Sequence, residues 1–289
     1  MLKNCYLCKT KNGAFAFNKI GYKIYQCKNC GLYFLQNETS YKKFIEKYYQ
    51  KGYFNGDKKL RAYANYQEDK VTIQRNMDHY LEKITAFKKN GYLLDIGCAM
   101  GFLLELSEKK GFNSFGLDVS EYAVKIAQKK FGKKIILSSL SEAKLNKNFF
   151  DVITMFDLIE HLETPIEDLT NVKNSLKDDG ILVIQTGDAE SKWAKFMKRS
   201  WHFFAPPQHL FFYSRSTIEK VLSKAGFKII KIEKDGKFIS LRYLFHMMRY
   251  IKHDGVGDFL HNIVKNNFIG KLPIFLRFND NMIIYAKKN

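Results

Sequence analysis

The sequence of 289 residues contains no apolar run close to the roughly 20 residues that a membrane-spanning helix needs. Residues 1–5 also lack the apolar core of a secretory signal peptide. From these two absences we expect a cytoplasmic protein. With 46% hydrophobic residues, a chain of this length can bury one large core and a small satellite module.

Acidic residues are scarce relative to basic ones. The chain has 29 Asp and Glu against 48 Lys and Arg, which gives a formal net charge of +19. Such a charge attracts phosphates, nucleic acid or an anionic membrane surface, and it does not indicate which of these is the partner. Much of it is scattered over predicted helix faces, as at Lys109-Lys110, which is equally typical of a solvated surface. No RNA-binding motif is recognisable, so nucleic acid is not the favoured partner.

Cysteine is almost confined to the N-terminus, where four of the five form the pattern Cys5-x2-Cys8-x18-Cys27-x2-Cys30. Each Cys-x2-Cys pair can turn two thiolates toward one ion, and two pairs complete the tetrahedral shell of a structural zinc site. An iron-sulfur site and two disulfides are the alternatives, and a reducing cytoplasm disfavours the disulfides. Four thiolates leave no open coordination position, so we expect this zinc to hold the fold and to do no chemistry.

Strand-like and helix-like patterns alternate through the remainder of the chain. Apolar runs predict strands at 91–97, 114–118, 134–137, 151–156, 181–185, 228–233 and 281–286. Amphipathic patterns predict helices at 102–107, 122–130, 166–176 and 216–224. Such alternation indicates an α/β fold with a doubly wound, seven-stranded parallel sheet. We therefore expect a zinc ribbon at 1–36, a helical connector at 37–90 that packs on the α/β domain, and that domain at 91–289.

The turn after the first strand of this sheet lacks the Gly-x-Gly-x-x-Gly pattern of dinucleotide sites. It has Ala99 and Phe102 at the second and third glycine positions, which disfavours a pyrophosphate ligand and an oxidoreductase. An adenosyl ligand without phosphates tolerates both changes. Asp118 follows the first glycine by about 20 residues, where an acid can accept both hydroxyls of a ribose. Because doubly wound sheets bind ligands at this edge, the sequence predicts an adenosyl site here.

These segments resemble the motifs of a known family. The run Leu-Asp-Ile-Gly-Cys-Ala-Met-Gly at 94–101 resembles the first motif of class I S-adenosylmethionine-dependent methyltransferases, and 116–120 resembles the second. Residues 150–165 and 176–184 look like the family's fourth-strand and fifth-strand segments. The resemblance is closest to the branch of ubiquinone O-methyltransferases and sugar-pathway methyltransferases. Some members of that branch carry N-terminal zinc ribbons.

The resemblance implies a Rossmann-like sheet with S-adenosylmethionine as its cofactor. The cofactor-binding residues that it implies are Asp95, Gly97, Cys98, Ala99, Gly101, Asp118, Val119 and Phe156. Among them, Cys98 is expected to be a small buried residue rather than a nucleophile. No clear acid follows the third strand near Ser138, so the sequence predicts no residue for adenine recognition.

Acidic and histidine side chains gather where the fourth strand ends, the edge that the reactive methyl faces in the family. A helix that begins near Asp157 would place Asp157, Glu160 and His161 on one face. Similar clusters in ubiquinone O-methyltransferases and small-RNA 2′-O-methyltransferases hold a divalent ion with a later histidine, which here would be His209. We predict these four residues as the catalytic set, around a divalent ion or with a histidine as general base. The alternative is that Glu160 and His161 only cap and orient the neighbouring loop.

Two insertions are expected to select the substrate. The first, at 187–214, contains Trp193 and Trp201 and resembles an aromatic roof over an acceptor pocket. The second, at 236–280, includes a basic amphipathic pattern at 238–252. That pattern suits burial against the domain, a cover over the active site, a membrane surface or a dimer contact.

These features favour methyl transfer to a small-molecule acceptor, namely a hydroxyl of a sugar, a glycan intermediate or a quinone-like compound. The chain would then orient the acceptor oxygen in line with the methyl group. One alternative is an RNA methyltransferase that uses the zinc ribbon for recognition. Another is a non-catalytic interaction protein that binds S-adenosylmethionine. The sequence leaves the oligomeric state open.

Overall fold

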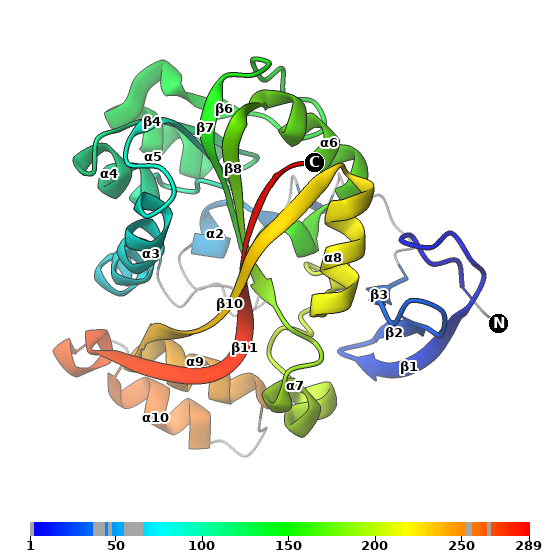
Figure 1. Ribbon diagram of the computed structural model, residues 1–289. Helices are drawn as coiled ribbons and strands as arrows, with labels where there is room; N and C mark the ends of the chain where they lie inside the picture. The colour runs from blue at the N-terminus through cyan, green and yellow to red at the C-terminus, as the bar shows by residue number, and fades with distance from the viewer. Residues whose placement is uncertain (1–2, 37–43, 46–47, 55–65, 252–255, 265–266) are drawn as a thin grey trace.

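The computed structural model describes residues 3–36, 44–45, 48–54, 66–251, 256–264 and 267–289. Two sheets organise them, a seven-stranded sheet in the main body and a four-stranded sheet that includes the N-terminal strands. Figure 1 shows the N-terminal strands beside the main body. Within these residues, no helix is both long enough and apolar enough to cross a membrane.

The central sheet has the strand order β10-β11-β8-β7-β4-β5-β6. Its strands are β4 (Gly91–Ile96), β5 (Phe112–Asp118), β6 (Ile135–Leu137), β7 (Phe150–Phe156), β8 (Leu176–Gly187), β10 (Phe227–Ser240) and β11 (Pro273–Lys288). The predicted seven-stranded Rossmann-like sheet is confirmed. It is mixed rather than parallel, because β11 runs antiparallel to both β10 and β8. β10 and β11 pair along almost their whole length.

Helices cover both faces of this sheet (Figure 1). One face packs against α3 (Lys70–Thr85), α4 (Phe102–Lys109) and α5 (Glu121–Phe131). The other packs against α6 (Pro165–Ser175) and α8 (Arg215–Lys224). Successive strand residues point to opposite faces, so Leu93 belongs to the first core and Leu94 to the second.

The N-terminal ribbon shares its sheet with the main body. Its own strands are β1 (Gly13–Lys19), β2 (Tyr22–Cys27) and β3 (Tyr33–Leu35). The fourth strand of this sheet is β9 (Phe211–Phe212), which comes from the predicted roof. Phe204 of the roof also meets Phe17 and Tyr33 of the ribbon edge to face. The predicted domain boundaries stay predictions, and 37–43, 46–47 and 55–65 of the connector lie outside the described residues.

In the second insertion, the first helix begins after residue 238, where the predicted amphipathic pattern begins. Strand β10 continues to Ser240, because 238–240 pair with 273–275 of β11. The helices are α9 (Leu241–Ile251), α10 (Val256–Val264) and the 3-10 helix η4 (Phe268–Lys271). Arg242 of α9 is buried and lies 2.8 Å from Asp69, so α9 packs against the domain. Lys252, the end of the predicted amphipathic pattern, lies outside the described residues.

Candidate active site and cysteine cluster

The turn that joins β4 to α4 folds back over the end of β5. The amides of Gly97 and Cys98 both donate to the Leu117 carbonyl, at 2.8 and 3.1 Å. Gly97, Ala99 and Gly101 have positive φ angles of 82°, 46° and 78°. Glycine adopts this left-handed conformation freely, whereas at Ala99 it costs about 1 kcal/mol. The alanine in the glycine position is therefore tolerated at a modest cost in stability.

Asp118 ends β5, and its carboxylate binds the turn. Its Oδ2 accepts a hydrogen bond from the Ala99 amide and its Oδ1 accepts one from the Ser120 amide, both at 2.8 Å. Burial raises the pKa of this carboxyl above its ordinary value. Each oxygen has a second lone pair, so Asp118 can still accept the hydroxyls of a ligand. Val119 follows it, half-buried, at the start of the loop to α5.

Asp95 and Cys98 lie buried next to the turn. Asp95 accepts a hydrogen bond from the Thr154 hydroxyl at 2.7 Å, and burial raises its pKa to about 7. The sulfur of Cys98 lies against Gly116, where an added Cβ would approach it to 2.6 Å. Burial raises the pKa of the Cys98 thiol well above its ordinary value. A buried neutral thiol is a poor nucleophile, in keeping with the packing role expected for Cys98.

The expected helix at the end of β7 does not form. Phe156 packs edge-on against Tyr80, Asp157 follows with a φ of 48°, and a single 3-10 turn, η2 (Ile159–His161), comes next. The reason is that sheet pairing extends one residue further, since the Asp157 amide donates to the Gln185 carbonyl at 2.9 Å. The prediction of one helical face for Asp157, Glu160 and His161 is therefore wrong. Asp157 pairs instead with Lys237 of β10, whose Nζ lies 2.9 Å from its Oδ2.

Glu160, His161 and His209 do come together. Each offers one potential ligand atom within 4.8 Å of the other two. Glu160 is buried, and its Oε2 accepts a hydrogen bond from the Thr186 hydroxyl at 2.9 Å. Its Oε1 has no hydrogen-bond partner among the residues that the structure describes. Burial, together with the charge of Asp157, raises the pKa of Glu160 to about 8. A buried oxygen without a hydrogen-bond partner lowers the stability of the folded chain, and a bound cation or a proton would supply the missing partner.

Backbone carbonyls orient both histidines of this cluster. Nδ1 of His161 donates to the Gln208 carbonyl at 3.0 Å, and Nδ1 of His209 donates to the Phe203 carbonyl at 2.7 Å. Burial lowers the pKa of both imidazoles, that of His161 to about 4. The two rings therefore stay neutral with Nε2 as an acceptor. Histidines that bind metal ions are typically held in this way.

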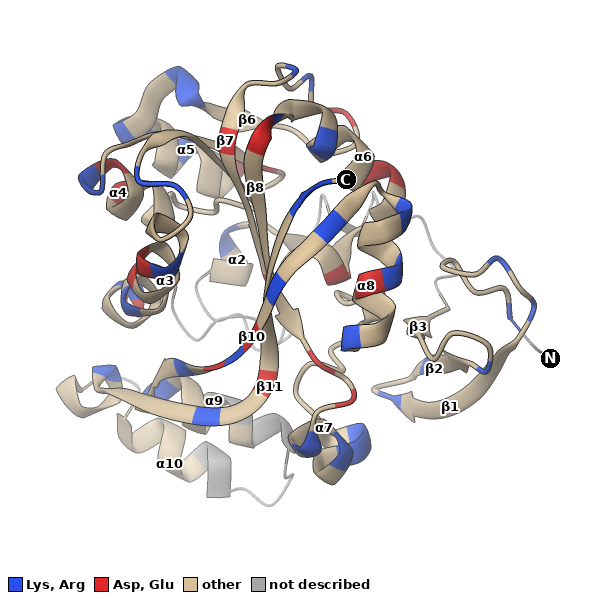
Figure 2. Cartoon of the chain, in the orientation of Figure 1, with Lys and Arg blue, Asp and Glu red and all other residues tan. Residues whose placement is uncertain are grey.

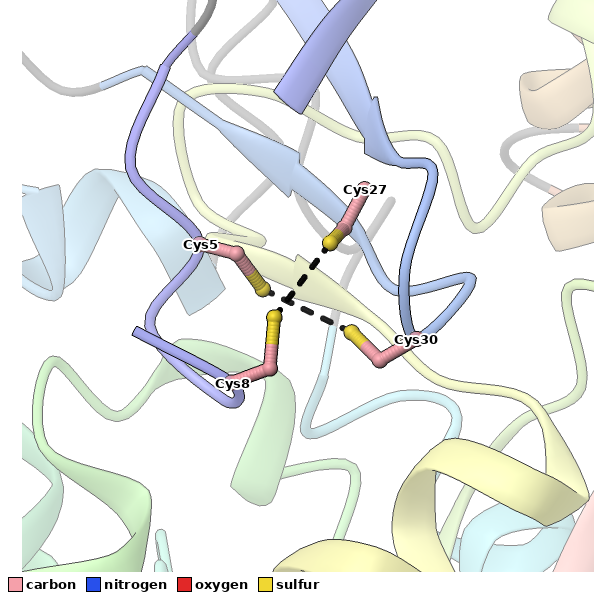
Figure 3. Close-up of side chains that lie close together, drawn as sticks. All are labelled: Cys5, Cys8, Cys27 and Cys30. Atoms are coloured by element: carbon pink, nitrogen blue, oxygen red, sulfur yellow. Dashed lines mark hydrogen bonds between the residues drawn. The ribbon is translucent and has the colours of Figure 1, made fainter. Parts of the chain in front are cut away.

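The four N-terminal cysteines point toward one another (Figure 3). The sulfur of Cys5 lies 3.5 Å from that of Cys30, and the sulfur of Cys8 lies 3.5 Å from that of Cys27. A disulfide is about 2.05 Å long, so the cysteines are free thiols. Four sulfurs within 4.8 Å of one another fit the tetrahedral donor set of zinc.

Backbone hydrogen bonds connect the ribbon to the histidine cluster. The Leu35 amide of β3 donates to the Leu210 carbonyl, and the Leu210 amide donates to the Glu160 carbonyl, both at 2.8 Å. Leu210 directly follows His209 in the chain. The ribbon therefore helps to position the segment that carries His209, a relation that the sequence does not reveal.

A profile of a methyltransferase-domain family matches residues 67–232, more than half of the chain. The chain belongs to this methyltransferase family. It is 30% identical over 118 residues to the ubiquinone biosynthesis O-methyltransferase of Rickettsia canadensis, covering 38% of this chain and 50% of that one. It is also 30% identical over 101 residues to the mitochondrial ubiquinone biosynthesis O-methyltransferase of Schizosaccharomyces pombe, covering 32% and 37%. The chain thus spans about half, or less, of the length of these curated relatives.

Solved structures share the fold of this methyltransferase chain. A SAM-dependent methyltransferase from Archaeoglobus fulgidus matches with a TM-score of 0.54 and 24% identity, covering 82% of this chain and 99% of that one. Magnesium protoporphyrin IX methyltransferase from Synechocystis, solved with bound SAH, matches with a TM-score of 0.55 and 16% identity, covering 86% and 100%. The prediction of a class I methyltransferase is thus confirmed at the level of family and fold.

Residues outside the predicted set also lie near the methyltransferase site, Tyr66 and Lys237 among them. Tyr66 of the connector stacks on Phe102 with ring centroids 5.1 Å apart, directly after the glycine turn. Burial and nearby carboxylates raise the pKa of its hydroxyl. Lys237 reaches Asp157 from a strand 80 residues further along the chain. The aromatic richness of the connector is a weak signal for Tyr66, and no local pattern marks Lys237.

Proposed function

We propose that this chain transfers the methyl group of S-adenosylmethionine to a hydroxyl oxygen of a small molecule, with a quinone-like phenol as the favoured acceptor. The cluster of Glu160, His161 and His209 carries the proposal, because it is an oriented polar site beside the strand ends where such sheets bind ligands. Relatives that act in ubiquinone biosynthesis favour a phenol over a sugar or a glycan intermediate.

The turn at 97–101 and Asp118 are the proposed cofactor site. Each carboxylate oxygen of Asp118 accepts one backbone hydrogen bond and has a second lone pair. These second lone pairs would accept hydrogen bonds from the ribose hydroxyls. The other predicted cofactor residues keep their proposed roles, namely Asp95, Gly97, Cys98, Ala99, Gly101, Val119 and Phe156. When bound, the cofactor supplies an electrophilic methyl group. The chain's own task is to exclude water and to hold the acceptor oxygen in line with that group.

A divalent ion suits the histidine cluster better than a general base does. Glu160 offers an oxygen without a partner among the described residues, and the two imidazoles offer neutral nitrogens, a mixed donor set that suits zinc, iron or manganese. A bound ion would supply Lewis acidity that favours loss of the acceptor's proton. Without an ion, His161 with a pKa of about 4 would be a weak base.

Methyl-labelled S-adenosylmethionine tests the acceptor class. We expect purified chain to label a catechol that carries an apolar tail, and to label a sugar nucleotide or an RNA transcript much less. Label mainly in RNA would favour the alternative in which the ribbon recognises nucleic acid. Cofactor binding without product from any acceptor would favour the non-catalytic alternative.

We propose that the N-terminal cysteines hold one structural zinc ion. The proposed ligands are Cys5, Cys8, Cys27 and Cys30. Metal binding to such a site is coupled to folding, because a small ribbon has little core of its own. Because β3 of the ribbon pairs with β9, zinc binding would also stabilise the roof segment.

Replacing Cys27 by serine is expected to remove most of the bound zinc, because one of its four ligands loses its thiolate. The amides of β9, at 211–212, should also exchange faster with solvent, since this strand pairs with the ribbon. Elemental analysis and hydrogen exchange measure the two effects. The matched control is Cys98→Ser, which changes the one cysteine outside the ribbon and should keep the zinc. Unchanged zinc in Cys27→Ser would refute the assignment.

A further inference from the structure

Large apolar side chains are exposed on the elements at the end of the molecule built by the second insertion and α7 (Lys192–Met197). We define this surface, the basic-aromatic face, by eight large hydrophobic side chains that are 39% to 78% exposed. They are Phe196, Phe259, Ile263, Phe268, Ile269, Leu272, Phe275 and Phe278. Figure 1 places α7, α9, α10 and the lower arc of β11 at this one end. Concentrated exposed apolar surface of this kind marks a site of interaction.

Two parts of the chain meet in this face. Trp193 of α7 stacks on Phe278 of β11 with ring centroids 4.4 Å apart, and it also contacts Phe196. On α10, Phe259 and Ile263 are four residues apart and so share one side of the helix. They are 66% and 53% exposed, and the helix therefore presents an apolar stripe to solvent.

Exposed cations accompany these apolar side chains. They are Lys192, Lys195, Lys198 and Arg199 on and after α7, with Lys271 and Arg277 at the other end of the face. Lys192, Lys195 and Lys198 have no acidic partner within the part of the chain that the structure describes. Figure 2 shows blue segments at α7 and on the lower arc of β11. The face is thus apolar and positively charged at once.

We infer that the basic-aromatic face docks this protein on an anionic membrane surface. Aromatic and aliphatic side chains flanked by Lys and Arg are the composition of segments that lie in the headgroup region of a bilayer. The positive charge of the face favours an anionic membrane over a second copy of the chain as its partner. A symmetric dimer through this face would bring its cations near those of its partner, and like charges in an interface oppose association.

Strands β10 and β11 connect the basic-aromatic face to the proposed active site. On β10 and β11, Lys237 pairs with Leu276 and Phe238 with Phe275. The Lys237 side chain reaches Asp157 at the end of β7, while Phe275 is 46% exposed on the face. If the proposed acceptor carries an apolar tail, this arrangement brings the site close to the bilayer that would hold it. Docking itself does not depend on the proposed function.

Vesicle co-sedimentation of the full chain, without cofactor or acceptor, tests the inference. We expect binding to vesicles of phosphatidylglycerol and phosphatidylcholine, weaker binding to phosphatidylcholine alone, and weakening by salt. The double variant Phe259→Ser with Ile263→Ser should bind at least tenfold less. Lys192→Glu with Lys195→Glu should lose the preference for anionic vesicles. The matched control, Phe15→Ser with Val71→Ser, changes residues of similar exposure outside the face and should bind as the original chain does.

Three results would overturn the inference. The first is no binding of the original chain to anionic vesicles, and the second is binding that the variants in the face do not change. The third is a dimer in light scattering that Phe259→Ser with Ile263→Ser dissociates, which would assign the face to self-association. Melting temperatures of all variants confirm that each is folded. Because no methyl transfer is measured, these outcomes are separate from those that test the proposed function.

Discussion

Methyl transfer is expected to fall by roughly 100- to 10,000-fold when His161 or His209 is replaced by alanine. Each imidazole offers a ring nitrogen to the cluster that includes Glu160, so each change removes a proposed ligand of the ion. Cofactor affinity should change little, because the lost interaction belongs to the transition state. Initial rates with labelled cofactor and calorimetric titration of S-adenosylhomocysteine measure the two quantities.

The control for these variants is His79→Ala. His79 lies on α3, where Nε2 is 2.6 Å from Asp235, outside the cluster. Its replacement should leave the rate nearly unchanged. A chelator should abolish transfer and an added divalent ion should restore it, in protein shown to retain its cysteine-bound metal. A double variant of His161 and His209 with a rate within about threefold of the original would support the loop-capping alternative instead.

Replacing Asp118 by alanine is expected to weaken S-adenosylmethionine binding by about 100-fold, or about 3 kcal/mol. Two charge-assisted hydrogen bonds to ribose hydroxyls would be lost, and the turn would lose its contact with the Ala99 amide. Calorimetry measures the affinity, and a smaller rise of the melting temperature with cofactor should accompany it.

A matched control for Asp118→Ala is Glu121→Ala. This exposed acid lies three residues further on and pairs with Lys125, so the change removes the same charge without touching the turn. Cofactor affinity should be unaffected in this control. Equal affinities in Asp118→Ala and in the original chain would show that the site has been placed wrongly.

The glycine turn and Asp118 could be predicted from the sequence because their relation is nearly local. A short strand, a turn with glycines in the left-handed conformation and an acid at the end of the next strand are enough to bring Asp118 to the Ala99 amide. The four cysteines could be predicted for the same reason, since each Cys-x2-Cys pair is a local unit.

Contacts between distant segments could not be predicted in this way. Strand β8 begins at Leu176, earlier than its apolar run suggests, because Leu176 pairs with Phe150. Asp157, in the left-handed conformation, contacts the Gln185 carbonyl through its amide and Lys237, 80 residues away, through its carboxylate. The pairing of β3 with β9 joins the ribbon to the roof, and neither strand has a sequence pattern that specifies its partner.

The turn at 97–101 and Asp118 are expected to hold S-adenosylmethionine rather than a dinucleotide. Calorimetric titration of the purified chain with S-adenosylmethionine and, separately, with NAD tests it most directly. We expect one S-adenosylmethionine bound per chain, weaker binding in Asp118→Ala, and no measurable heat from NAD. Binding of NAD in place of S-adenosylmethionine, or no binding of either, would contradict it.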